Sequence, residues 1–186
     1  MVVVVVALGL ALLIQAFLVK PFRIPSESMV PTLEIGQRVL VDRVSYRFGE
    51  PDRGDIIVFH PPAGADSGRC GVEPANGQPC PRGTSDRSGT NFIKRVVGVP
   101  GDRIKVIESS VYINGKRQSE PFARLDPGCD TCNLPRELTV PKGEYFMMGD
   151  NRGASEDSRV WGPVPKRWII GRAFATYWPP GRLGVF

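Results

Sequence analysis

Residues 91–106 read NFIKRVVGVPGDRIKV, and this stretch contains two strand patterns joined by a turn. The run 92–99 is apolar except for Lys94 and Arg95, which is typical of a buried strand. Pro100-Gly101-Asp102 is a turn signal, and basic and apolar residues alternate over 103–106, as in a strand with one buried face. Working outward, further short strands are predicted at residues 39–41, 56–59, 111–113, 145–148 and 168–178.

Turn chemistry outside this stretch also favours short strands. Asn114-Gly115 is a strong two-residue hairpin signal. The chain has 21 glycines and 18 prolines among 186 residues, and no amphipathic helix of normal length is evident in it. We therefore predict a mainly β fold, an antiparallel β-sheet domain with a small cap or insert.

Composition limits the function classes. The length of 186 residues fits one domain, or one domain plus an insert. The net charge of +5 fits anionic partners, either lipid headgroups or nucleic acid. No basic run interleaved with aromatic residues supports nucleic acid, so we expect no such partner. The single histidine, His60, excludes mechanisms that need two histidines and His-rich metal sites.

The most apolar segment is residues 2–19, whose one polar side chain is Gln15. A helix of this length spans about 27 Å, close to the thickness of the hydrocarbon core of a membrane. A buried core helix is the first alternative, but a small soluble domain rarely buries a helix that is apolar all round. A cleaved leader is the second, but Lys20-Pro21-Phe22-Arg23 follows where a small-residue cleavage site would stand. We predict a single N-terminal transmembrane helix.

The four cysteines form two local pairs, which favours the disulfides Cys70–Cys80 and Cys129–Cys132 and an oxidising compartment. A zinc site is the first alternative, but nine residues separate the first pair instead of two to four. A redox Cys-x-x-C motif is the second, but the surrounding Asp-Pro-Gly and Asn-Leu-Pro are typical of loops. Lys20 and Arg23 follow the apolar run, and by the positive-inside rule they favour a cytoplasmic location for the domain after it. The basic residues and the cysteines therefore predict opposite sides of the membrane for this domain.

Two segments look like inserts. Residues 60–90 are rich in glycine and proline and poor in large apolar side chains, so we expect an exposed loop tied by its cysteine pair. Residues 108–141 carry the second pair and are expected to form a small cap. The main β domain is then residues 20–107 and 142–186.

Three polar segments carry the candidate chemistry. Each has an ordinary explanation: a turn or helix cap for Ser26 and Ser28, an edge lysine reaching solvent for Lys94, and a plain polar turn for residues 148–163. The segments are PSESMVPTL at 25–33, NFIKRVVGVPGD at 91–102 and MGDNRGASEDSRVWGP at 148–163.

Together with RGDIIVF at 53–59, these blocks resemble the type I signal peptidases, in the order of that family and over the whole chain. The resemblance implies a membrane-anchored serine endopeptidase that removes signal peptides from secreted preproteins through a Ser-Lys dyad and an acyl-enzyme, without metal or cofactor. A lysine at position 94 is similar to the bacterial form, because relatives from the endoplasmic reticulum and archaea have histidine there. The implied location is the bacterial cytoplasmic membrane, single-pass, with the catalytic domain on the extracytoplasmic face.

The resemblance also assigns residue roles. Ser28 would be the nucleophile and Lys94 its general base. The Ser28 N–H and the Ser26 hydroxyl would form the oxyanion hole, and Ser155 would orient the lysine. Supporting roles fall to Arg95, Asp150, Asp157 and Arg159.

Lys94 must be neutral to accept a proton. Lowering its pKa from about 10.4 to about 7–8 requires burial among apolar groups, with no carboxylate close by. We expect that apolar wall to consist of Met29, Phe92, Ile93 and Val96.

Substrates are expected to be signal peptides with small residues at the first and third positions before the cut, the Ala-x-Ala pattern. Shallow pockets for these residues are expected from Phe22, Ile24, Met29, Leu33, Val58 and Ile93. Aromatic and basic residues near the C-terminus are expected to contact membrane lipid, with a role as ordinary core aromatics as the alternative for at least half of the aromatic ones. They are Trp161, Trp168, Tyr177, Trp178, Lys166, Arg167 and Arg182.

Two rival functions remain from the sequence. A self-cleaving Ser-Lys repressor-type domain is disfavoured by the anchor and the paired cysteines. A catalytically silent membrane-anchored β module is disfavoured by Ser28 and Lys94. His60 is expected to be a solvated residue at a strand end, without a role in the chemistry.

Overall fold

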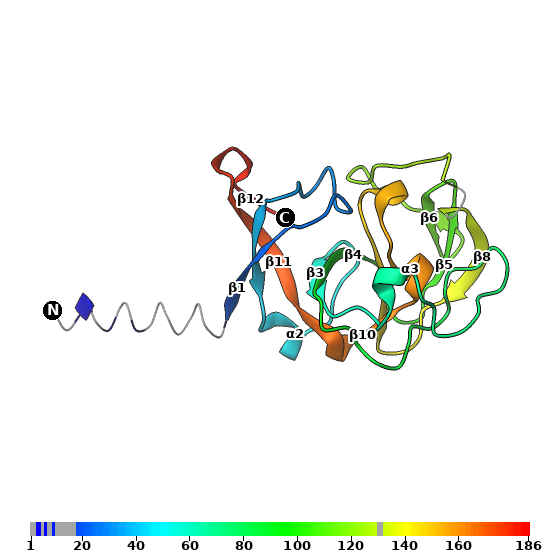
Figure 1. Ribbon diagram of the computed structural model, residues 1–186, viewed down its shortest axis with the longest axis horizontal. Coiled ribbons are helices and arrows are strands. Elements are labelled where there is room, and N and C mark those ends of the chain that lie inside the picture. Colours follow the sequence, from blue (N-terminus) through cyan, green and yellow to red (C-terminus); the bar gives the residue numbers. More distant parts are fainter. Residues whose placement is uncertain (1–2, 5, 7–8, 10–17, 130–131) are drawn as a thin grey trace.

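The computed structural model describes residues 3–4, 6, 9, 18–129 and 132–186. Its main sheet has the strand order β1-β2-β11-β3-β4-β9-β10, with β12 pairing with β11 (Figure 1). Each of these pairings is antiparallel, which confirms the predicted mainly β fold. The strands are β1 (Val19–Arg23), β2 (Arg38–Asp42), β3 (Ile56–Phe59), β4 (Phe92–Gly98), β9 (Glu144–Met148), β10 (Val164–Pro165), β11 (Ile169–Trp178) and β12 (Gly184–Val185).

A second, four-stranded sheet lies at the far end of the molecule from β1 (Figure 1). Its order is β7-β6-β5-β8, from β5 (Arg103–Ile107), β6 (Ser110–Ile113), β7 (Lys116–Arg117) and β8 (Leu134–Thr139). The predicted hairpin joins β6 to β7 through Asn114 and Gly115, both of which have positive φ as a two-residue turn requires. Because β5 belongs to this sheet, the sheet begins at residue 103, before the segment 108–141 expected to form the cap.

Residues 3, 4, 6 and 9 are helical. The helices whose bounds lie within the described residues are all short. They are α2 (Ser45–Phe48), α3 (Ser158–Trp161) and the 3-10 helices η1 (Ala65–Ser67), η3 (Arg152–Ala154), η4 (Lys166–Trp168) and η5 (Pro180–Arg182).

The predicted anchor at residues 2–19 lies largely outside the described residues. Among those that are described, no helix is long and apolar enough to cross a membrane. The last residue of the predicted segment, Val19, is the first residue of β1.

Residues 60–90 are partly packed rather than wholly exposed. Ala65 is fully buried in the same apolar cluster as Trp161. The Cys80 N–H donates to the carbonyl of Arg159 at 2.9 Å, which holds the segment against α3. The glycine-rich composition does not predict this packing, because backbone atoms make the contacts in place of apolar side chains. Gly83, for example, lies against the Trp161 carbonyl.

Both predicted disulfides are present. Cys70 and Cys80 have a Cα–Cα distance of 5.8 Å, and Cys129 and Cys132 one of 5.2 Å. Both distances lie in the normal range for bridged cysteines. With both bridges formed, no described cysteine is a free thiol that could bind zinc in this structure.

Strand β4 sits in the middle of the main sheet and holds Lys94. It pairs with β3 on one side, where Ile57 faces Lys94, and with β9 on the other, where Met148 faces Arg95. Strand β3 is buried along its whole length, so a side chain in the middle of β4 is surrounded by apolar structure.

Candidate active site

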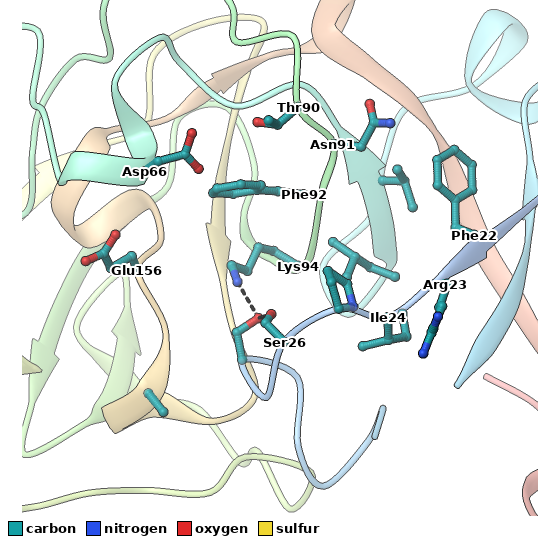
Figure 2. A pocket seen from close by; sticks show the side chains of 15 residues that line it. Phe22, Arg23, Ile24, Ser26, Asp66, Thr90, Asn91, Phe92, Lys94 and Glu156 are labelled. Atoms are coloured by element: carbon teal, nitrogen blue, oxygen red, sulfur yellow. Dashed lines mark hydrogen bonds between the residues drawn. The ribbon is translucent and has the colours of Figure 1, made fainter. Parts of the chain in front are cut away.

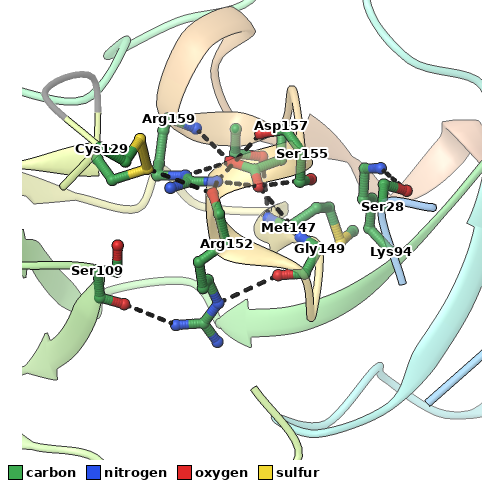
Figure 3. A network of polar contacts seen from close by, with 12 residues as sticks. Ser28, Lys94, Ser109, Cys129, Met147, Gly149, Arg152, Ser155, Asp157 and Arg159 are labelled. Carbon is green, nitrogen blue, oxygen red and sulfur yellow. Dashed lines mark hydrogen bonds and ion pairs between the residues drawn. A yellow bond between two sulfur atoms is a disulfide. The ribbon is translucent and has the colours of Figure 1, made fainter. Parts of the chain in front are cut away.

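Ser28 and Lys94 come from distant parts of the sequence and are in contact in the structure. Ser28 lies in the turn segment that follows β1, and Lys94 is the third residue of β4. The Lys94 Nζ donates to the Ser28 Oγ at 2.6 Å (Figure 3). Each residue is only 5% exposed, so this contact is shielded from bulk water.

Burial lowers the pKa of Lys94 to about 8, because the ammonium form loses its hydration. The carboxylate of Asp157 raises this pKa in opposition, and the guanidinium of Arg159 lowers it again. Among the described residues, Lys94 forms no ion pair with a carboxylate, and the buried carboxylate of Asp157 is itself paired with Arg159. Phe92 contributes to the surroundings, with its ring centroid 5.7 Å from the lysine nitrogen.

Ser26 lies beside the nucleophile candidate. Its Oγ is 3.3 Å from the Ser28 Oγ. No described residue accepts a hydrogen bond from the Ser28 N–H. Two donors, the Ser26 hydroxyl and the Ser28 N–H, are thus next to the Ser28 oxygen.

A polar network lies beside Ser28 and Lys94 (Figure 3). Its centre is Asp157, which is fully buried and makes two hydrogen bonds of 2.8 Å with the guanidinium of Arg159. Burial alone would raise the pKa of Asp157, but Arg159 and the backbone N–H of Gly149 outweigh it and hold this pKa below its ordinary value. The predicted Asp157–Arg159 ion pair is present.

Ser155 does not hydrogen-bond to Lys94 as the resemblance implies. Its hydroxyl donates to the Asp157 carboxylate at 2.9 Å, and no hydrogen bond joins it to Lys94 within the described part of the chain. Position 149 must be glycine, because a Cβ there would lie 2.2 Å from the Ser155 Oγ and 2.4 Å from the Ser28 carbonyl oxygen. Gly149 thus brings this loop into direct contact with the segment that contains Ser28.

A second ion pair links β4 to the loop after β9, and Thr32 connects the segment that contains Ser28 to the same carboxylate. Arg95 donates to both oxygens of Asp150, at 2.8 and 2.6 Å, and Thr32 donates to the same carboxylate at 2.5 Å. Asp150 is fully buried. The next residue, Asn151, donates its backbone N–H to the Ser28 carbonyl at 3.0 Å. Arg95 and Asp150 therefore have the supporting positions expected for them, and Thr32 is an additional member that the sequence pattern did not single out.

A cleft of about 660 Å³ opens over Ser28 and Lys94. Four of the six predicted pocket residues line it: Phe22, Ile24, Val58 and Ile93. Met29 and Leu33 do not line it, since both are fully buried in the core beneath. Met29 and Leu33 lie in a turn segment and not in a strand. The alternation of buried and exposed positions along a strand therefore could not predict which way their side chains point.

The opposite end of the cleft is acidic. Asp66 and Glu156 line it there, beyond Lys94 as seen from Phe22 and Ile24 (Figure 2). Glu156 belongs to a segment that the sequence analysis singled out for its polarity. No sequence signal marked Asp66, which reaches the cleft from the segment 60–90.

The remaining predicted residues divide between core and surface. Trp161 and Trp168 are buried core residues, whereas Tyr177 and Trp178 are 37% and 50% exposed. The His60 ring is hydrogen-bonded to the Thr90 carbonyl at 3.1 Å. Among the described residues, no group of three or more histidine, cysteine, aspartate or glutamate side chains could hold a metal ion.

This chain is similar to known proteins over most of its length. A family model described as signal peptidase, peptidase S26, matches residues 1–178. A probable signal peptidase I-1 from Synechocystis sp. is 42% identical over 184 residues, covering 96% of this chain and 81% of that protein. Signal peptidase I from Leptolyngbya laminosa is 41% identical over 175 residues, covering 94% and 76%. The crystal structure of a signal peptidase I from Enterococcus faecalis is 26% identical with a TM-score of 0.43, covering 67% of this chain and 97% of that one.

Proposed function

From the premise that this chain belongs to the signal peptidase family, peptidase S26, and is a serine endopeptidase that removes signal peptides, we propose that it works through a Ser28–Lys94 dyad. The observation that carries the proposal is the 2.6 Å contact between the Ser28 Oγ and the Lys94 Nζ. This distance suits direct proton transfer.

The proposed reaction begins with Lys94 neutral. Its lone pair accepts the Ser28 hydroxyl proton while the Oγ attacks the scissile carbonyl carbon. The C–N bond then breaks, Lys94 returns the proton to the departing amine, and an ester joins the signal peptide to Ser28. Water, deprotonated by Lys94, hydrolyses that ester. With a pKa of about 8, a fraction of Lys94 is neutral near pH 7.

We assign the oxyanion hole to the Ser28 N–H and the Ser26 hydroxyl. Both donors are adjacent to the nucleophile oxygen, which supports this role. Removal of one such donor costs about 3 kcal/mol of transition-state stabilisation.

We assign Asp157, Arg159, Arg95 and Asp150 to positioning of the two segments that meet at the dyad. Ser155 acts on Lys94 through Asp157 in this proposal, because its hydroxyl is bonded to that carboxylate. Asp157 in turn raises the pKa of Lys94 and limits how far burial lowers it.

The proposed cleavage sites are of the Ala-x-Ala type. Apolar side chains line one end of the cleft, Phe22, Ile24, Val58 and Ile93 among them. They suit small side chains before the cut, because two bulky residues, Phe22 and Phe92, limit the space.

We propose that residues 2–19 anchor the protein in the bacterial cytoplasmic membrane with the catalytic domain on the extracytoplasmic face. The two disulfides support an oxidising compartment. Exposed apolar residues near the C-terminus would contact membrane lipid; they are Tyr177, Trp178, Leu183, Val185 and Phe186.

The test of site specificity is cleavage of a signal-peptide substrate in detergent, with products identified by mass spectrometry. Cleavage is expected directly after the second alanine of Ala-x-Ala. Tryptophan in place of either alanine should abolish it, and tryptophan at the middle position should be tolerated. Equal cleavage of all three variants would refute the proposed specificity.

A further inference from the structure

The two ends of the cleft over Ser28 differ in chemistry. Phe22 and Ile24 lie at one end, and the carboxylates of Asp66 and Glu156 lie at the other, with Lys94 between them (Figure 2). Both acidic residues are exposed. Neither makes an ion pair or accepts a hydrogen bond within the described chain. Two charges without a partner therefore face the place where substrate must lie.

Both carboxylates are attached to well-held backbone. Asp66 is in η1, next to Ala65, which is fully buried. Glu156 stands between Ser155 and Asp157, whose side chains are hydrogen-bonded to each other at 2.9 Å. The acidic end of the cleft is thus built from two segments far apart in the sequence, each fixed by its own packing.

The direction of the substrate determines what these carboxylates meet. This step rests on the proposed function, in which the small residues before the cut occupy the apolar end near Phe22 and Ile24. Because the nucleophile lies between the two ends, the residues after the cut extend toward Asp66 and Glu156. Those residues become the N-terminus of the mature protein.

We propose that Asp66 and Glu156 select for the charge of the first residues of the mature protein. Lysine or arginine at the first or second position after the cut is favoured by Coulomb attraction, and aspartate or glutamate there is disfavoured. The segment 60–90 thereby contributes to substrate choice as well as to packing on α3.

The experiment compares kcat/KM for three Ala-x-Ala peptides that differ only in the first residue after the cut: lysine, alanine or aspartate. The full-length protein in detergent is expected to prefer the lysine over the aspartate peptide by about fivefold at low ionic strength, since exposed charge pairs are this weak. The preference should shrink at high salt, because exposed charges are screened.

The Asp66→Asn/Glu156→Gln double variant should bring the lysine-to-aspartate ratio close to one. The comparison uses the ratio of kcat/KM for the lysine and aspartate peptides because Glu156 also raises the pKa of Lys94. Loss of that effect changes kcat/KM for all three peptides equally and therefore cancels in the ratio. Glu73→Gln is the matched control: this exposed residue is in the same segment and outside the cleft, and its ratio should equal that of the wild type.

An unchanged ratio in the double variant would overturn this inference while leaving the proposed function intact. If the wild-type protein cleaves none of the Ala-x-Ala peptides, both the inference and the proposed function fail.

Discussion

Lys94 is a lysine in the middle of a central strand, and its surroundings favour the neutral amine. Burial lowers its pKa to about 8 from an ordinary value of 10.5. The neighbouring Asp157 opposes this shift and Arg159 supports it. The proton affinity of the proposed base is therefore set by burial first and by one ion pair second.

The pH dependence of cleavage follows from this pKa. If neutral Lys94 is the base, kcat/KM should rise with pH through a midpoint near 8 and then level off. The measurement uses an acetylated peptide without groups that titrate between pH 6 and 9.5. A profile that is flat or falling over pH 7–9 would count against Lys94 as the base.

The stability of the folded protein should depend on pH through the same residue. Since the folded pKa is lower than the unfolded one, the unfolded chain binds more protons between pH 8 and 10.5, and wild-type stability rises with pH in that window. At pH 7 Lys94→Met should therefore raise the free energy of unfolding by up to about 3 kcal/mol.

Urea denaturation at pH 7 and pH 10 checks this expectation. The gain from Lys94→Met should be largest at pH 7 and smaller at pH 10. A variant that is no more stable than the wild type at pH 7 would mean that burial of Lys94 is not destabilising.

At the scale of single residues, the sequence pointed to side chains that the fold brings together, but not to all of their contacts. Ser28, Lys94 and Ser26 could be found because their motifs are local. Ser155 was assigned to Lys94 by resemblance, yet its hydroxyl is bonded to Asp157, a choice between two partners that depends on side-chain geometry. Asp66 could not be found, because only the fold brings it to the cleft.

Among the elements, the loop that contains Gly149 and Asp150 joins β4 to the nucleophile segment. Asp150 binds Arg95 from β4 and Thr32 from the segment after Ser28. Removing one partner of a buried ion pair leaves the other charge without compensation, which is costly.

Asp150→Ala should accordingly destabilise the protein by about 3 kcal/mol or more, measured by urea denaturation. Glu137→Ala is the matched control, because Glu137 pairs with Arg103 at 3.8 Å on the surface and should cost less than about 1 kcal/mol. Equal losses in the two variants would show that the buried pair has no special structural role.

The strands themselves were largely predictable from alternation and turn signals. The strands around residues 39–41, 56–59 and 145–148 all occur, each extended by two residues or fewer in the structure. What could not be predicted was which sheet each joins: β5 follows β4 directly but belongs to the second sheet. Local periodicity gives strands, whereas pairing depends on contacts between distant segments.

For the whole molecule, one group of exposed apolar residues belongs to the C-terminal segment around β12, where Val185 pairs with Ala175 of β11. Trp178 is half exposed, whereas Trp161 and Trp168 are core residues. If this surface contacts lipid, only Trp178 among the tryptophans in the structure is accessible from the bilayer.

Vesicles containing brominated lipid provide the measurement, because bromine quenches tryptophan fluorescence at short range. The full chain reconstituted in such vesicles should show partial quenching that disappears in Trp178→Phe. Quenching that persists in this variant would place the lipid contact elsewhere on the molecule.

The central claim is that Ser28 and Lys94 together perform the cleavage. The most direct measurement is kcat/KM on one Ala-x-Ala peptide for the wild type, Ser28→Ala, Lys94→Ala and His60→Ala, with circular dichroism to verify folding. Loss of more than about 1,000-fold is expected for each dyad variant, and near wild-type activity for His60→Ala. Cleavage by folded Lys94→Ala at close to the wild-type rate would contradict the account.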